Sequence, residues 1–76
     1  MKDGLPKKAG ILREQRVHLK MTQEEVAHEV GINLQQYQRY EYGDRDLRKI
    51  PMELGLRICR LLGLDPYELI LGDAKP

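Results

Sequence analysis

The sequence predicts an all-α fold, a single compact bundle of five helices. Apolar residues recur at helical spacing, capping residues precede most of the expected helices, and glycines follow them. A chain of 76 residues builds one domain around one hydrophobic core. We expect flexible ends at residues 1–6 and 73–76 and a folded domain over residues 7–72.

The composition excludes several classes of protein. The single cysteine, Cys59, cannot form an intramolecular disulfide and offers no metal cluster. No apolar run approaches the length of a membrane span, and the charged N-terminus lacks the apolar core of a signal peptide. We therefore expect a cytoplasmic protein that does not enter a membrane, with no metal and no cofactor.

The distribution of charge is more informative than the net charge of +1. Basic residues outnumber acidic ones over residues 1–20 and again over residues 44–50, whereas acids collect at Glu24, Glu25 and Glu29. This pattern is compatible with a locally basic face on a nearly neutral domain, for which long-range electrostatic steering of a partner is modest.

The first helix is expected over about residues 7–19, where Leu12, Arg16 and Leu19 share one inward stripe. A guanidinium on an inward stripe needs a partner, because an unpaired buried charge is costly. Glu41 is the one acid on the inward side of a later helix. The sequence therefore predicts an ion pair between Arg16 and Glu41.

The second helix begins with a capping box, in which Thr22 is the N-cap and Glu25 lies three residues later. Met21 precedes the cap and Val26 follows it at the spacing of a hydrophobic staple. Gly31 ends the helix. The inward stripe consists of Val26, Ala27 and Val30.

The third helix repeats this pattern, with Asn33 as N-cap, Gln36 completing the capping box, Ile32 and Tyr37 as the staple, and Gly43 as the left-handed stop. One face is almost entirely apolar: Leu34, Tyr37, Tyr40 and Glu41. The other face consists of Gln35, Gln38, Arg39 and Tyr42. Glutamine and arginine side chains form bidentate hydrogen bonds with adenine and guanine in the DNA major groove.

A polar helix face taken alone is more often merely solvated, so the preceding residues decide the interpretation. Only Gly31, Ile32 and the cap separate the second and third helices, which is the spacing of a helix-turn-helix unit. Residues 9–43 resemble the lambda-repressor/Cro type of helix-turn-helix protein, the XRE family. The matching segments are Leu12-Arg13-Glu14, Met21-Thr22-Gln23-Glu24-Glu25-Val26-Ala27, Val30-Gly31-Ile32-Asn33 and Tyr40-Glu41-Tyr42-Gly43, with a looser match over residues 62–69.

The resemblance implies a lambda-repressor-like bundle and a set of DNA-contacting residues. Those at base-facing positions are Asn33, Leu34, Gln35 and Arg39. Those at flanking or backbone-facing positions are Gln36, Gln38 and Tyr42. Gln23 would contact a DNA phosphate at the start of the second helix. Leu34 departs from the polar residue often found there, and either contacts a thymine methyl or packs on Gln23. Lys20 replaces a frequent glycine, which implies left-handed strain at that position.

The linker over residues 44–50 is longer than expected for this family, which costs little chain entropy. Its basic residues Arg45, Arg48 and Lys49 have two readings. They clamp the DNA backbone beside the groove, or they form a solvated run of charge. The sequence does not choose between these readings.

The fourth helix is expected over residues 52–62, between Pro51 and Gly63. Gly55 inside it indicates a close backbone contact, and Cys59 is read as a core residue.

The last helix is expected to start at Asp65, with Pro66 in its first turn, Glu68 completing a capping box, and Leu64 stapled to Leu69. One helix face cannot bury all of residues 69–71 within a monomer, which indicates an interface. The resemblance implies a homodimer that places two recognition helices about 34 Å apart over successive major grooves.

The sequence favours a sequence-specific double-stranded DNA-binding transcriptional regulator, a repressor that binds a two-fold operator. The alternative is an antitoxin or accessory module that binds a protein partner through the last two helices, with DNA binding secondary. An enzyme is disfavoured, because the chain has no setting for a nucleophile and no glycine-rich phosphate loop.

Overall fold

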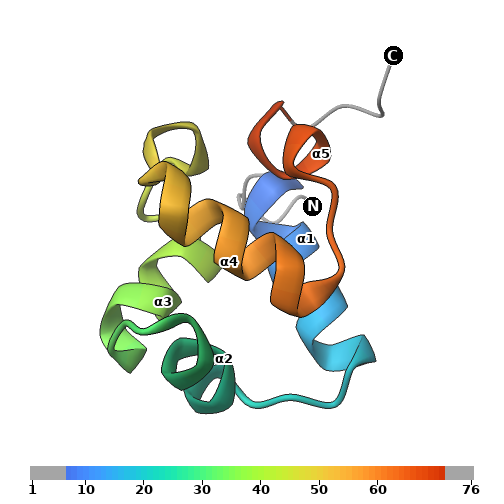
Figure 1. Ribbon diagram of the computed structural model, residues 1–76, viewed down its shortest axis with the longest axis vertical. Helices are drawn as coiled ribbons and strands as arrows, with labels where there is room; N and C mark the ends of the chain where they lie inside the picture. Colours follow the sequence, from blue (N-terminus) through green and yellow to red (C-terminus); the bar gives the residue numbers. More distant parts are fainter. Residues whose placement is uncertain (1–6, 72–76) are drawn as a thin grey trace, which may run out of the picture.

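The computed structural model describes residues 7–71 and is helical, with no strand in that range (Figure 1). The elements are α1 (Lys7–His18), α2 (Gln23–Val30), α3 (Leu34–Glu41), a short 3₁₀ helix η1 (Leu47–Lys49), α4 (Met52–Leu62) and α5 (Pro66–Leu71). The predicted all-α fold with five α-helices is confirmed. The flexible ends expected at residues 1–6 and 73–76 lie outside the described residues. None of the described helices combines the length and apolarity that crossing a bilayer requires.

Both predicted capping boxes are present. Thr22 Oγ1 accepts from the Glu25 amide at 3.0 Å, and Glu25 Oε1 accepts from the Thr22 amide at 2.8 Å. Asn33 Oδ1 accepts from the Gln36 amide at 2.8 Å, while Gln36 Oε1 accepts from the Asn33 amide at 3.1 Å. Because these bonds satisfy backbone amides that a helix start leaves unpaired, they fix where α2 and α3 begin.

Left-handed residues follow four of the helices, and Gly63 after α4 has φ of 71°. Gly31 at the end of α2 has φ of 85°, and Gly43 after α3 has φ of 87°. Lys20 has φ of 60° and is the one residue other than glycine with positive φ in the described range. The strain expected at Lys20 is therefore present, because its Cβ is crowded in a conformation that glycine adopts freely.

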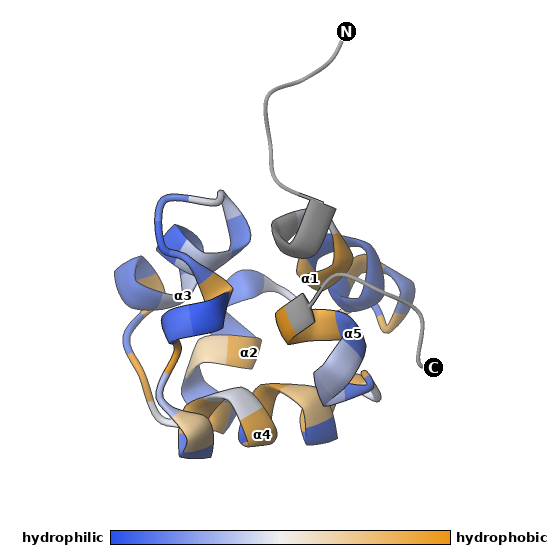
Figure 2. Ribbon diagram, turned by 90° about the horizontal axis from the view of Figure 1, so that it is seen from above, coloured by the Kyte–Doolittle hydropathy of each residue, from blue (hydrophilic) through white to orange (hydrophobic). Residues whose placement is uncertain are grey.

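The core lies between α4 on one side and α1, α2 and α3 on the other, with α5 closing one end (Figure 1). Figure 2 shows apolar segments along α2, α4 and α5. The buried apolar residues are Leu12, Val26, Ala27, Val30, Tyr37, Tyr40, Leu47, Ile58, Cys59, Leu62 and Leu69. The predicted core role of Cys59 is confirmed.

Several local predictions need correction. Leu19 does not join the inward stripe, because α1 ends at His18 and the left-handed turn leaves Leu19 42% exposed. Gly55 is buried, but a Cβ there would meet the side chain of Ile50, 3.2 Å away at Cγ2, and not a backbone. At the start of α5, Asp65 Oδ1 accepts from the Tyr67 amide at 3.1 Å, one position before the expected capping box.

The linker contains a core residue that the sequence analysis missed. Leu47 is 3% exposed and opens η1, for which Asp46 is the N-cap. Of the three apolar residues at the end of α5, Leu69 is buried and Ile70 is half-buried. The side chain of Leu71 lies outside the described residues.

We expect Lys20→Gly to raise the free energy of unfolding by about 1 kcal/mol, because glycine removes the left-handed strain while loosening the unfolded chain. Chemical denaturation of the purified chain measures the change. Lys20→Ala is the matched control, since alanine keeps the Cβ and should gain nothing. Equal stabilisation by both variants would show that the lysine charge, and not the backbone, is responsible.

Candidate nucleic-acid interface

The three-residue connection over residues 31–33 brings α3 directly against α2. The Gly31 amide donates to the carbonyl oxygens of Ala27 and His28 at 3.0 and 3.2 Å, which closes α2. The half-buried side chain of Ile32 follows, and Asn33 starts α3. A turn this short leaves the two helices at an angle and exposes the outer face of the second one.

A buried ion pair ties α1 to α3. Arg16 donates from Nε to Glu41 Oε2 at 2.8 Å and from Nη2 to Glu41 Oε1 at 3.0 Å, which is the bidentate geometry. Its Nη1 also donates to the carbonyl oxygen of Met21 at 2.9 Å. The side chains of Arg16 and Glu41 are only 13% and 1% exposed. The ion pair predicted from the sequence is therefore confirmed.

Two further donors converge on the same carboxylate. Tyr37 Oη donates to Glu41 Oε2 at 2.8 Å, and Gln23 Nε2 donates to Glu41 Oε1 at 2.7 Å. Burial opposes ionisation of Glu41, but the hydrogen bonds from Arg16, Gln23 and Tyr37 outweigh it and lower the pKa of this carboxyl group. Burial, together with the bond to Glu41, raises the pKa of Tyr37.

The outward face of α3 carries two side chains that are free to bind. Gln35 and Arg39 are exposed, and neither side chain makes a hydrogen bond or an ion pair within residues 7–71. Tyr37 and Tyr40, on the opposite side, are 0% and 6% exposed. The helix therefore presents an amide and a guanidinium to solvent while its tyrosines anchor it.

The remaining predicted contact residues of α3 are partly engaged. Asn33 and Gln36 are exposed, but their side-chain oxygens already cap the helix, which leaves their amide nitrogens available. Leu34 is half-buried. Gln38 is half-buried and Tyr42 is 47% exposed.

Gln23 lies against α3 instead of projecting alone from α2. Besides the bond to Glu41, its Oε1 accepts from Gln38 Nε2 at 2.9 Å. Its Nε2 lies 3.3 Å from Tyr42 Oη. The structure thus brings together Gln23, Gln38 and Tyr42, three residues that the resemblance assigns to DNA contacts, and bonds them to each other.

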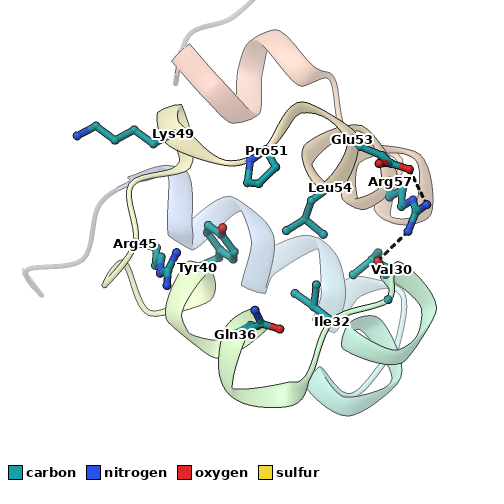
Figure 3. A pocket seen from close by; sticks show the side chains of 11 residues that line it. Val30, Ile32, Gln36, Tyr40, Arg45, Lys49, Pro51, Glu53, Leu54 and Arg57 are labelled. Carbon is teal, nitrogen blue, oxygen red and sulfur yellow. Dashed lines mark hydrogen bonds and ion pairs between the residues drawn. The ribbon is translucent and has the colours of Figure 1, made fainter.

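The two linker arginines point to different parts of the molecule. Arg45 lies beside α3, where its amide donates to the carbonyl oxygen of Arg39 at 3.1 Å. With Gln36, Tyr40 and Lys49 it lines a cavity of about 440 Å³ between α3 and α4 (Figure 3). Arg48 instead pairs with Asp46 at 3.0 Å. It lines a cavity of about 320 Å³ with residues of α4 and α5.

No group of three or more His, Cys, Asp or Glu side chains within residues 7–71 could hold a metal ion. Burial raises the pKa of Cys59, which keeps its thiol protonated and a poor nucleophile.

Comparison with known proteins gives one result. A protein-family model described as Helix-turn-helix matches residues 12–69, a span that begins within α1 and ends within α5. The curated proteins and the solved structures give no match.

We expect Arg16→Met to lower the free energy of unfolding by about 3–5 kcal/mol, because it leaves the Glu41 carboxylate buried without its charge partner. Thermal or denaturant unfolding measures the loss. Arg13→Met is the control, since Arg13 is an exposed residue of the same helix. Similar small losses in both variants would mean that the ion pair contributes little.

The lowered pKa of Glu41 also predicts a pH dependence. The ionised form is favoured in the native state, so its contribution is complete above the ordinary value of 4.5 and is lost as the pH falls through the lower native pKa. The stability difference between the native chain and Glu41→Gln should therefore be constant near neutral pH and shrink below about pH 4.5. A difference that stays unchanged in strong acid would contradict the role of the charge.

Proposed function

This chain belongs to the XRE type of helix-turn-helix proteins, the lambda-repressor/Cro-like DNA-binding regulators, and we propose that it represses transcription by binding a specific sequence of double-stranded DNA. One observation carries the proposal. Gln35 and Arg39 are exposed on α3 and have no partner within the described chain, while the opposite side of the helix is locked into the core.

These two side chains match the chemistry of the major groove. Glutamine pairs with the N6 and N7 atoms of adenine, and arginine pairs with the O6 and N7 atoms of guanine. The free amide nitrogens of Asn33 and Gln36 add donors at the N-terminal end of the same helix. Because α3 is already folded, binding would order only its exposed side chains, and the entropic cost of binding is correspondingly small.

We assign the contacts with the DNA backbone to residues at the edges of this face. Arg45 is exposed, and its side chain has no partner in the described chain. Because its amide is bonded to the end of α3, it is the linker cation placed to meet a phosphate beside the groove. Arg48 is the weaker candidate, since it already pairs with Asp46.

The exposed apolar residues of α4 support a homodimer. Met52 and Leu56 are 79% and 50% exposed, and they line one cavity with Ile70 of α5. Exposed apolar residues that cluster on one surface mark interfaces in soluble domains. A two-fold dimer would set two copies of α3 over successive major grooves about 34 Å apart, and a bound dimer would block a promoter that overlaps the site.

The same apolar surface supports one competing function, an antitoxin or accessory module that binds another protein through α4 and α5. The two functions predict different assemblies. A purified chain that sediments as a dimer at micromolar concentration favours the repressor. A chain that stays monomeric until a stoichiometric protein partner is added favours the interaction module.

Selection of bound duplexes from a random pool, repeated at two salt concentrations, tests the proposed function. The expected product is an enriched sequence with two symmetric half-sites about 10 base pairs apart. The fall of affinity with salt counts the phosphates contacted. Retention of duplexes without any enriched sequence would refute sequence-specific recognition.

Alanine variants should separate base readout from backbone contact. Gln35→Ala and Arg39→Ala should each cost about 1–3 kcal/mol of binding free energy and relax preference at one base position. Arg45→Ala should weaken all sequences alike and reduce the salt slope by about 1. Competitive binding to single-base variants of the selected duplex measures both effects. Arg13→Ala, at an exposed arginine of α1, is the control. Identical behaviour of all four variants would contradict this assignment.

A further inference from the structure

A continuous chain of hydrogen bonds runs from the buried ion pair to the surface of α3. It passes from Arg16 to Glu41, from Glu41 to Gln23, and from Gln23 to Gln38, over contacts of 2.8, 2.7 and 2.9 Å. Each member belongs to the part of the molecule that forms the helix-turn-helix unit or supports it. The donor and acceptor ends of the bonds at Gln23 and Gln38 follow from the ionised carboxylate of Glu41.

The ionised Glu41 side chain can only accept hydrogen bonds. Gln23 must therefore turn its NH₂ group toward Glu41 Oε1, 2.7 Å away. The reversed amide would place its oxygen against a carboxylate oxygen in a residue that is 2% exposed, with no proton between the two. That arrangement leaves two acceptors facing each other in the interior, so the orientation of the Gln23 amide is fixed.

In this orientation both amide hydrogens and the carbonyl oxygen of Gln23 face hydrogen-bonding partners. One amide hydrogen goes to Glu41, the other faces Tyr42 Oη at 3.3 Å, and the carbonyl oxygen accepts from Gln38 at 2.9 Å. A phosphate oxygen could bind the Gln23 side chain only by displacing Tyr42 or breaking the bond to Glu41. Gln23 is therefore poorly suited to the phosphate contact that the family resemblance implies.

The same orientation is passed to Gln38. Because the oxygen of Gln23 faces Gln38, Gln38 must donate from Nε2, and its own Oε1 stays without a protein partner. Within residues 7–71 no buried side-chain nitrogen or oxygen lacks a partner. The free Oε1 of this half-buried residue is thus open to solvent.

We propose that Gln23 is a positioning residue, which transmits the polarity of the Arg16–Glu41 pair to Gln38 so that Gln38 presents a carbonyl oxygen to the DNA major groove. This proposal rests on the proposed function. An acceptor at this position selects a base that carries an exocyclic amine in the major groove, adenine or cytosine, and disfavours the oxygens of guanine and thymine. Gln35 has no such partner and keeps both orientations of its amide.

The first test uses the full chain without DNA. Hydrogen exchange of the glutamine side-chain amides, followed by NMR on the ¹⁵N-labelled protein, should be about tenfold slower for Gln23 and Gln38 than for Gln35. Gln23→Met should bring the exchange of Gln38 to the rate of Gln35. Equal rates for all three glutamines in the unsubstituted chain would overturn the proposal.

The second test uses the duplex obtained by selection and its single-base variants. Gln23→Met should reduce discrimination at one base pair of each half-site about tenfold and leave preference elsewhere unchanged. Gln38→Met should relax the same base pair, and the double variant should add nothing further. Gln35→Met is the control and should relax a different position. A Gln23→Met variant that weakens every sequence alike would support a phosphate contact and overturn the proposal.

Duplexes with single uncharged methylphosphonate linkages separate the two roles directly. If Gln23 positions Gln38, the effect of Gln23→Met persists whichever phosphate is neutralised; if it contacts a phosphate, the effect disappears at one linkage. Should Gln23→Met unfold, Gln38→Met leaves every bond to Glu41 in place and decides the matter through base preference. Failure to select any sequence would refute the proposed function alone, because the exchange measurement does not involve DNA.

Discussion

The buried carboxylate of Glu41 organises this molecule. Four hydrogen bonds from Arg16, Gln23 and Tyr37 converge on its two oxygens, and these residues come from α1, α2 and α3. A buried charge is tolerated only when its partners are complete. Because the partners of this carboxylate come from three helices, moving any one of these helices would leave the buried charge incompletely hydrogen-bonded.

That constraint divides α3 into an anchored side and a free side. Tyr37, Tyr40 and Glu41 are buried, whereas Gln35 and Arg39 are exposed and unengaged. The capping box at Asn33 uses side-chain oxygens and spares side-chain nitrogens. Recognition by this helix thus depends on which of its hydrogen-bonding groups have no partner within the protein. Gln38 lies at the border between the anchored side and the free side.

The apolar surface of α4 and α5 lies on other elements than the recognition face. Met52 and Leu56 are exposed there, and Arg48 lines the same cavity. Assembly through this surface would leave α3 open to DNA. Arg45 and Arg48 are only three positions apart in the sequence, yet the 3₁₀ turn anchored by buried Leu47 directs them to different cavities.

The amino-acid sequence by itself determined the features that depend on near neighbours: both capping boxes, the left-handed ends at Gly31 and Gly43, and the strain at Lys20. It also determined the Arg16–Glu41 pair, since each is an isolated charge on an inward stripe and has little choice of partner. Only the tertiary structure decided the exposure of Leu19, the burial of Leu47 and the hydrogen bonding of Gln23 to residues of α3. A glutamine side chain can donate or accept, and which partners it finds depends on groups that three separate helices bring together. The spacing of residues along the chain therefore does not predict the partners of Gln23.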